Sequence, residues 1–478
     1  MSKRKRNVNS DSAAANLELE NKKIKPSSSP TSPESDFKTS ITIQLVAGSY
    51  DGVIHGVTAK ILPKTAEFAD TFLYTAHNAA IRCLALSPPS APIPNKTRKI
   101  YLASGSTDER IHLYHLSAHA PSKTTVPTIP NITQNPIIEN PQNRELGALL
   151  HHSSAITALY FPNRGKLLSS AEDRQISIIR TRDWNVLCSV KSPVPKQIGR
   201  PSGDTAPVGG TPSGINDFAV HPSMKLMISV SKGEKCMRLW NLVTGKKAGV
   251  LNFDKIQTAQ LGNGKYSSRE GRKVVWGSTE EGDEFCVGFE RGLIVYGMDS
   301  RPRCIVLPQT RTKIHQVDYF EVSTDDMALT VSTEDGRLIF YSTKSDDLSV
   351  CSDDEKNKNT LPFAKQIAQL GGETVGLTGR IKDFSILPVG EGSIKSFIIA
   401  TAGSNGDLRL WRIQQNDLKS QTGPSKQIGT VLGSYMTNNR ITCLKAFIMF
   451  PSEDNEDEDE IDQEDYSSDS SNISSNSD

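Results

Sequence analysis

The sequence has no long apolar run and few cysteines. No segment approaches the ~20 continuous apolar residues that a helix needs to span a bilayer, so we expect no membrane-spanning helix. Its seven cysteines are scattered and include no C-x-x-C pair, which argues against a disulfide framework and a structural zinc site. The first residues, Met-Ser-Lys-Arg-Lys-Arg, precede no apolar stretch. We therefore expect no secretory signal and an intracellular protein.

The motifs of common enzyme classes are also absent. The sequence contains no G-x-x-x-x-G-K-[ST], H-E-x-x-H or G-x-S-x-G pattern and no kinase signature. His112, His115 and His119 are closely spaced, but a strand would turn their side chains to different faces. We therefore predict no catalytic residue, no metal site and no cofactor, and we expect neither an enzyme nor a small-molecule substrate.

Positive and negative charges nearly balance over the whole chain, but they are unevenly distributed along it. The chain has 55 Lys and Arg residues and 54 Asp and Glu residues, a net charge of +1. Residues 452–478 carry 12 acidic and no basic side chains, and residues 1–36 carry 7 basic and 5 acidic ones, which leaves +11 for residues 37–451. Such asymmetry indicates contact with nucleic acid or another charged partner.

A short unit recurs seven times along the chain. Each copy has an apolar strand ending in Ser or Ala, a tight polar turn, and an alternating strand that usually ends in an aromatic residue. Asp, Asn and Gly supply the positive φ that such a turn needs, so we expect the recurrent acids to be structural. The repeat resembles WD40 repeats of ~40–45 residues with inserted loops. The turns lie near residues 51, 108, 173, 234, 291, 335 and 406.

The two ends of the repeat array complement each other. Residues 41–47 read as a second strand with no innermost strand before them, and residues 440–447 supply a matching strand at the far end. We predict that this strand completes the first blade, which removes the free sheet edges. His77 and His151 take the position of the repeat's Gly-His pair. We place polar insertions between the blades at 88–99, 117–145, 191–213, 254–273 and 344–367.

These patterns predict an all-β protein: a seven-bladed WD40 β-propeller with a disordered N-terminal arm and an acidic C-terminal tail. We assign residues 1–40 to the disordered basic arm, 41–450 to the propeller closed by its C-terminal strand, and 451–478 to the disordered acidic tail. Both end segments lack the apolar residues that a packed core requires.

Two kinds of candidate regulatory site lie outside the repeats or in their loops. Two basic clusters in the arm are typical of a two-part nuclear import signal, with a polyanion-binding arm or a solubilising segment as alternatives. The clusters comprise Lys3, Arg4, Lys5, Arg6, Lys22, Lys23 and Lys25. Serines beside proline or acidic residues are candidate phosphorylation sites, which would add negative charge. They are Ser29, Ser32, Ser352, Ser467, Ser468 and Ser470.

Residues 46–52, 103–111 and 170–174 carry a closer resemblance. With them, the sequence is similar over about residues 41–449 to the WD40 family that includes the p21-activated-kinase-interacting protein of animals and its fungal ribosome-assembly relatives. The resemblance implies a non-enzymatic nuclear and nucleolar scaffold in large (60S) ribosomal subunit biogenesis, with pre-60S ribosomal proteins and assembly factors as partners. The alternative it implies is a signalling adaptor that binds and negatively regulates a p21-activated kinase.

The partner-binding residues and direct contact with rRNA stay open at this point. The basic body favours contact with RNA phosphates. The linear sequence shows no interleaved aromatic and basic residues that would mark a base-stacking platform. We therefore expect protein contacts to dominate, with rRNA contact at the periphery.

Overall fold

The structure is a computed structural model, and it describes the repeat region with several gaps. The described residues are 41–93, 97–121, 136–195, 213–262, 269–323, 326–349, 360–377, 379–390, 395–419 and 426–451. All belong to one compact unit of the chain, residues 40–478. The predicted import clusters and the six candidate phosphorylation sites lie outside the described residues. No helix in these ranges is long and apolar enough to cross a membrane.

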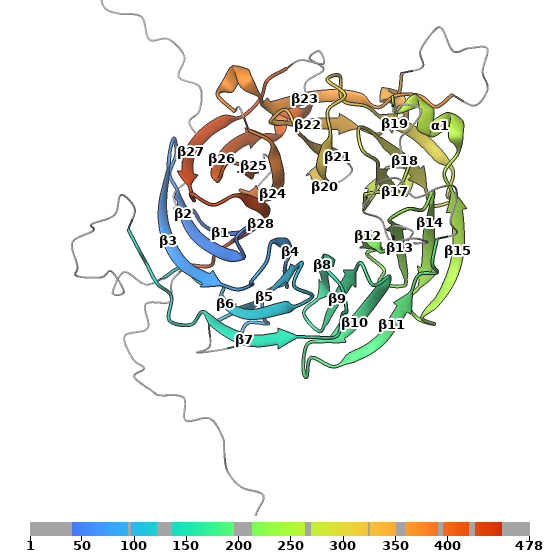
Figure 1. Ribbon diagram of the computed structural model, residues 1–478. Coiled ribbons are helices and arrows are strands. Elements are labelled where there is room, and N and C mark those ends of the chain that lie inside the picture. The colour runs from blue at the N-terminus through green and yellow to red at the C-terminus, as the bar shows by residue number, and fades with distance from the viewer. Residues whose placement is uncertain are drawn as a thin grey trace, which may run out of the picture. The chain divides into compact units, whose positions relative to one another are not determined.

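Seven four-stranded antiparallel sheets are arranged in a ring (Figure 1), and we call the region enclosed by their innermost strands the central channel. The predicted seven-bladed β-propeller is therefore confirmed. From the innermost to the outermost strand, blade 1 has β28 (Ile441–Ile448), β1 (Ile41–Ser49), β2 (Val53–Ile61) and β3 (Ala66–Thr75). Blade 2 has β4 (Ile81–Leu86), β5 (Lys99–Ser106), β6 (Ile111–Ser117) and β7 (Arg144–Leu149). Blade 3 has β8 (Ile156–Asn163), β9 (Lys166–Ala171), β10 (Gln175–Arg180) and β11 (Val186–Lys191).

The remaining blades follow the same order. Blade 4 has β12 (Ile215–Val220), β13 (Leu226–Ser231), β14 (Cys236–Asn241) and β15 (Lys246–Asn252). Blade 5 has β16 (Lys273–Thr279), β17 (Gly282–Gly288), β18 (Leu293–Gly297) and β19 (Pro302–Val306). Blade 6 has β20 (Ile314–Ser323), β21 (Asp326–Thr333), β22 (Arg337–Ser342) and β23 (Lys365–Gly371). Blade 7 has β24 (Ile381–Val389), β25 (Ser396–Gly403), β26 (Asp407–Gln414) and β27 (Thr430–Met436).

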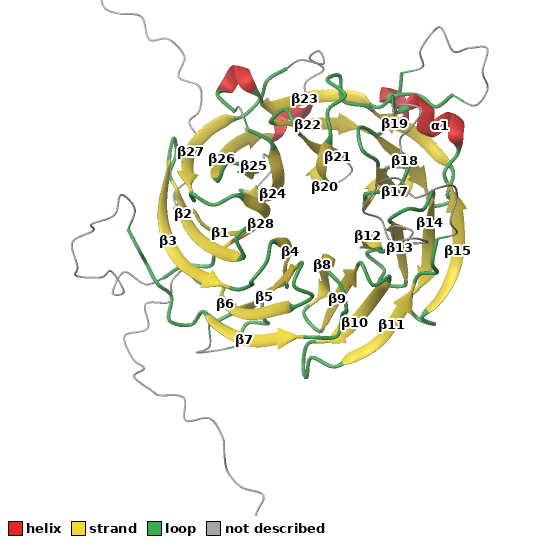
Figure 2. Cartoon of the chain, viewed as in Figure 1, coloured by secondary structure: helices red, strands yellow, loops and turns green. Residues whose placement is uncertain are grey.

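Helices in the described ranges are few and short, and they connect blades or strands (Figure 2). Besides 3-10 turns they are α1 (Lys255–Gln260) and α2 (Gln415–Lys419). The side chain of Asp254 caps α1 by accepting a hydrogen bond from the Ile256 backbone N–H. The fold is thus almost entirely strand, as the sequence predicts.

Blade 1 joins the two ends of the repeat region. The strand β28 pairs with β1 in antiparallel register, with Leu45 opposite Ala446. This is the pairing expected from the sequence. The buried side chains Ile43 and Leu45 of blade 1 then pack with Ile398 and Leu410 of blade 7. The ring is therefore closed by strand pairing within one blade and by apolar packing between blades 7 and 1.

The predicted placement of three insertions between blades is wrong. Insertions 88–99, 117–145 and 344–367 connect strands within blades 2 and 6, whereas 191–213 and 254–273 do connect blades. The error arises because outer strands such as β7 bury little apolar surface and give a weak sequence signal. The ends of two insertions also cover the edges of β3 and β19, through Ile138 N–H to Asp70 O (2.8 Å) and Ile305 N–H to Pro362 O (2.8 Å).

Candidate functional site

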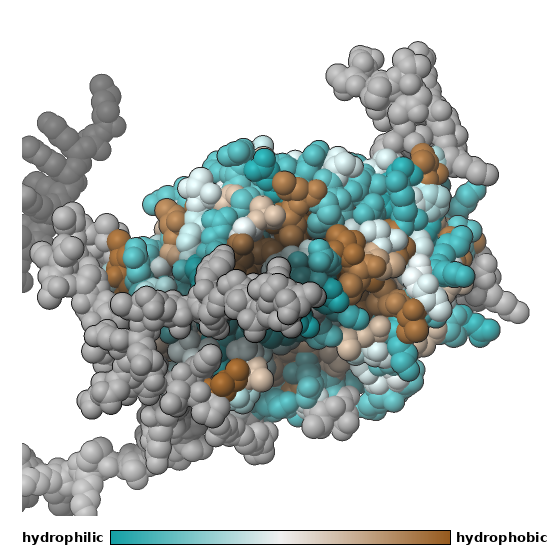
Figure 3. Space-filling model, turned by 90° about the horizontal axis from the view of Figure 1, so that it is seen from below, coloured by the Kyte–Doolittle hydropathy of each residue, from teal (hydrophilic) through white to brown (hydrophobic). Residues whose placement is uncertain are grey.

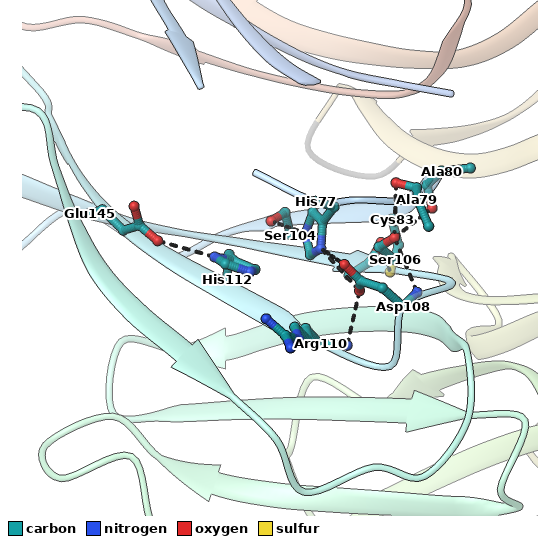
Figure 4. A network of polar contacts seen from close by, with 11 residues as sticks. His77, Ala79, Ala80, Cys83, Ser104, Ser106, Asp108, Arg110, His112 and Glu145 are labelled. Atoms are coloured by element: carbon teal, nitrogen blue, oxygen red, sulfur yellow. Dashed lines mark hydrogen bonds and ion pairs between the residues drawn. The ribbon is translucent and has the colours of Figure 1, made fainter. Parts of the chain in front are cut away.

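The channel mouth is shaped by the tight turns of the repeats, and buried histidines fix two of them. In blade 2, His77 Nδ1 lies 2.9 Å from Asp108 Oδ2, and its Nε2 lies 2.8 Å from Ser104 Oγ (Figure 4). Burial lowers the pKa of His77, so its ring is neutral at pH 7 and donates from Nδ1 to the carboxylate. Burial raises the pKa of Asp108, but hydrogen bonds from Arg110 N–H and His77 outweigh it and lower the pKa. This recurrent acid is therefore structural.

In blade 3 the equivalent histidine is His152, which corrects the assignment of His151. The His152 ring is fully buried, with Nδ1 2.9 Å from Asp173 Oδ2 and Nε2 2.8 Å from Ser169 Oγ. His151 reaches only Ser169, at 3.0 Å. Neighbouring residues of an extended segment point in opposite directions, so an error of one residue selects the wrong ring.

We predict that His152→Ala lowers the free energy of unfolding by about 2–3 kcal/mol, because the largely buried carboxylate of Asp173 loses its hydrogen bond to the His152 ring. His151→Ala is the matched control and should cost less than about 1 kcal/mol, since Asp173 keeps its partner. Urea denaturation of the two variants measures the difference. Equal losses would contradict the assignment of His152.

The rim of the channel is the end at which the innermost strands begin, and its geometry repeats. In six blades, the carbonyl of the residue before the innermost strand accepts a hydrogen bond from a backbone N–H of the blade's tight turn. The donor and acceptor pairs are Tyr50–Arg440 (2.7 Å), Thr107–Ala80 (3.2 Å), Glu172–Ala155 (2.9 Å), Lys232–Gly214 (2.8 Å), Glu334–Lys313 (2.9 Å) and Ser404–Arg380 (2.9 Å). The repeat thereby creates equivalent positions that different side chains occupy.

Half of this rim is basic. The residues before the innermost strands of blades 2, 3 and 4 are Ala80, Ala155 and Gly214, whereas blades 5, 6, 7 and 1 carry Arg or Lys there. In blade 7 a β-bulge between Ile381 and Asp383 adds a further cation at the rim, Lys382. We call these cations the basic arc: Arg272, Lys313, Arg380, Lys382 and Arg440.

Much of the charge of the basic arc is not neutralised. Arg380 pairs with Glu334 at 3.2 Å and Arg272 with Glu290 at 3.6 Å. Within the described ranges, the other three members, Lys313, Lys382 and Arg440, make no ion pair. Burial lowers the pKa of Lys382, and repulsion from Arg380, Lys313 and Arg440 lowers it further. The arc therefore favours an anionic ligand.

The opposite half of the rim differs in charge. There Glu172 of blade 3 pairs with Arg82 of blade 2 at 2.9 Å and lies 3.6 Å from Lys232 of blade 4. The glutamate partly offsets the two cations. The positive potential at the channel mouth is thus concentrated over the arc.

An exposed aromatic ring lies beside the arc. Tyr50, in the tight turn of blade 1, is 55% exposed, and the Arg440 guanidinium lies 5.1 Å from its ring centroid. The linear sequence shows no interleaved aromatic and basic residues, yet the fold brings this ring beside the arc. The two residues are nearly 400 positions apart in the chain, so no local pattern could reveal the pair.

Deeper in the channel, carboxylates join neighbouring blades. Asp383 of blade 7 accepts a hydrogen bond from the Leu444 N–H of blade 1 (2.9 Å), and Asp217 of blade 4 accepts one from the Val274 N–H of blade 5 (3.2 Å). Burial opposes the charge of Lys445, but Asp383 and the other channel acids outweigh it and raise the pKa of this lysine. The channel interior is therefore a structural region of mixed charge.

The acid Asp318 is expected to make stability depend on pH. Desolvation of its carboxyl group in the channel wall raises its pKa to about 6, although the side chain is exposed. Because this pKa exceeds the unfolded value of about 3.9, the contribution to stability is complete below pH ~4 and is lost as pH rises through 6. We expect the loss to stay below about 1 kcal/mol, because water screens the charge.

Urea denaturation of wild type and Asp318→Asn at pH 4.5 and 7.5 tests this expectation. The variant should gain stability relative to wild type at the higher pH, since the amide does not ionise. A difference between the two proteins that is the same at both pH values would contradict it.

Apolar surface gathers on the outer side wall. A cavity of about 170 Å³ between blades 4 and 5 is lined by residues that include Trp276, Phe285 and Met298. Large hydrophobic side chains are exposed on blades 3 and 4, among them Leu187 and Val243. Figure 3 shows hydrophobic side chains clustered on part of this wall. Exposed apolar surface of this kind is typical of protein–protein contact.

The three closely spaced histidines, His112, His115 and His119, each have a different partner. His112 Nδ1 lies 3.1 Å from Glu145, and His119 Nδ1 lies 3.0 Å from the Pro451 carbonyl oxygen. His115 stacks obliquely on Tyr101. In the part of the chain that the structure describes, no group of three or more His, Cys, Asp or Glu side chains is placed to hold a metal ion.

Comparison with known proteins agrees with the architecture. Residues 143–180, which contain β7 to β10, match the family "WD domain, G-beta repeat". Protein MAK11 of Saccharomyces cerevisiae is 26% identical over 393 residues, covering 77% of this chain and 77% of the relative. The p21-activated protein kinase-interacting protein 1-like of Danio rerio is 24% identical over 407 residues, covering 84% and 80%. The human p21-activated protein kinase-interacting protein 1 is 23% identical over 413 residues, covering 85% and 77%.

The names of these relatives are not those of enzymes, and WD40 propellers typically act as non-catalytic scaffolds. The similarity spans most of the propeller rather than one repeat. The chain is thus a seven-bladed β-propeller that contains a WD40 repeat and is similar along most of its length to Protein MAK11 and to the p21-activated protein kinase-interacting proteins.

Proposed function

We propose that this protein is a non-enzymatic assembly factor for the large (60S) ribosomal subunit, working in the nucleolus and binding pre-60S ribosomal proteins and assembly factors. The observation that carries the proposal is the basic arc, which a closed ring holds at one end of the channel. Precursors of the ribosome are polyanionic, and a positive rim attracts them. The similarity to the family with fungal ribosome-assembly members supports the same function.

Depletion of the protein tests this proposal. We expect free 60S subunits to fall and free 40S subunits to rise in a sucrose gradient, and a tagged copy to lie in the nucleolus. A wild-type copy expressed from a plasmid should restore the gradient. Unchanged 60S levels together with a cytoplasmic tagged protein would overturn the proposal.

A second candidate function is that of a signalling adaptor that restrains a p21-activated kinase. The names of the relatives from Danio rerio and Homo sapiens favour it. A pull-down with the purified kinase and a kinase assay test it directly. We would expect binding and reduced phosphorylation of a substrate, and neither binding nor altered activity would exclude this function.

A further inference from the structure

We propose that the basic arc and Tyr50 form a binding site for single-stranded RNA, in which the cations contact phosphates and the Tyr50 ring stacks on a base. This inference deepens the proposed function by naming a partner for the rim, and it is testable without ribosomes. The evidence is the position of the arc, its unpaired charge and the exposed ring beside it.

The cations are arranged as successive contacts for a strand. Lys313, Arg380 and Arg440 each precede the innermost strand of consecutive blades 6, 7 and 1, so they follow one another around the rim. In the sequence, Lys382 lies between Arg380 and Arg440, and it is repelled electrostatically by both. A phosphate backbone that runs along this arc would meet one cation after another. Each contact would release a counterion, as is general for protein–nucleic acid association.

Two contacts fix the position of Tyr50. The Tyr50 backbone N–H donates a hydrogen bond to the Arg440 carbonyl oxygen at 2.7 Å, which holds the turn against the rim, and the Arg440 guanidinium lies over the Tyr50 ring. A base that stacks on an exposed tyrosine gains affinity without sequence preference. At the equivalent position the other turns described above carry polar or charged residues: Thr107, Glu172, Lys232, Glu334 and Ser404. The ring is therefore specific to the blade beside the unpaired cations.

Single-stranded RNA fits this site better than other anions do. An acidic peptide would use the cations but would gain little from the exposed Tyr50 ring. In a duplex, the bases are already stacked on one another and are not offered to the ring. A single strand uses both the charges and the ring.

Fluorescence anisotropy with a labelled 12-nucleotide single-stranded RNA of mixed sequence and the full-length protein tests the charges. In the rim variant, Lys313, Lys382 and Arg440 are replaced by Gln. We expect at least a tenfold loss of affinity at 100 mM salt. The slope of log Kd against log salt should fall by about 2, because each single-strand phosphate contact contributes about 0.7.

The matched control removes the same charge elsewhere. Lys225, Lys246 and Lys247 are exposed on blade 4, and their replacement by Gln should change Kd less than twofold. Thermal melting verifies that each variant folds. Absence of RNA binding by the wild type, or equal losses in the rim and control variants, would overturn the inference.

Two further measurements test whether the Tyr50 ring stacks on a base and whether the ligand is RNA or an acidic peptide. Tyr50→Ala should weaken binding about fivefold or more, whereas Tyr50→Phe keeps the ring and should stay within about twofold of wild type. Unchanged affinity of Tyr50→Ala would overturn the stacking role. Displacement of the RNA by an equal concentration of a 12-residue polyglutamate peptide would instead identify an acidic protein segment as the ligand.

The outcomes also distinguish this inference from the proposed function. RNA binding at the rim with unchanged 60S levels after depletion would overturn the proposed function alone. Reduced 60S levels without rim-dependent RNA binding would overturn the inference alone.

Discussion

Deletion of residues 438–478, which include β28, is expected to abolish the cooperative thermal unfolding of the protein. Blade 1 would lose its innermost strand, leaving the inner edge of β1 unpaired. The deletion removes the buried side chains of Ile441 and Leu444, each worth about 1.5–3 kcal/mol. It also leaves Asp383 without the Leu444 N–H. We therefore expect an open, aggregating ring.

Deletion of residues 452–478 alone is the control for this experiment. It removes only the acidic tail and leaves β28 in place, so its melting temperature should match that of the full chain. Differential scanning calorimetry compares the two truncated proteins. Similar, cooperative transitions in both would contradict closure of the ring by β28.

Glu284→Ala is expected to lower the free energy of unfolding by about 3–5 kcal/mol, as is usual when one partner of a buried ion pair is removed. The Glu284 side chain is fully buried. It accepts hydrogen bonds from Thr343 Oγ1 (2.6 Å), Arg303 Nη1 (2.7 Å) and the Tyr319 hydroxyl (2.9 Å). Burial raises the pKa of Glu284, while these donors oppose the rise. The alanine would leave three hydrogen-bond donors without an acceptor at the boundary of blades 5 and 6.

Glu281→Ala provides the matched control for this carboxylate. Glu281 pairs with the same Arg303 at 2.7 Å, but its side chain is 56% exposed. Its loss should cost at most about 1 kcal/mol, as for other surface ion pairs. Urea denaturation of both variants measures the difference. Equal losses would show that the burial of Glu284 does not determine its contribution.

Features encoded by neighbouring residues could be predicted from the sequence. The tight turns at Asp108 and Asp173 have counterparts in every copy of the repeat, so the number of blades follows from counting the turns. The innermost strands of six blades also begin with Ile. Blade 5 departs from this pattern at its innermost strand, β16. This strand starts with Lys273 rather than Ile and buries only Val274 fully. Its pairing with β17 also lacks the bulge found in the innermost strands of most other blades.

Features that depend on the ring could not be predicted in the same way. The basic arc collects residues from positions 272 to 440, which become neighbours only when the blades close. Tyr50 joins Arg440 for the same reason. Glu284 follows Asp283 in a strand and reads as a solvated acid, although the fold buries it completely. Local patterns determine the blades, and the closed ring determines the site.

Cryo-electron microscopy of particles purified on the tagged full-length protein tests the central claim most directly. We expect pre-60S particles in which the propeller is bound with the rim of blades 6, 7 and 1 facing rRNA. Particles that lack large-subunit precursors, or a propeller whose basic arc faces solvent, would contradict it.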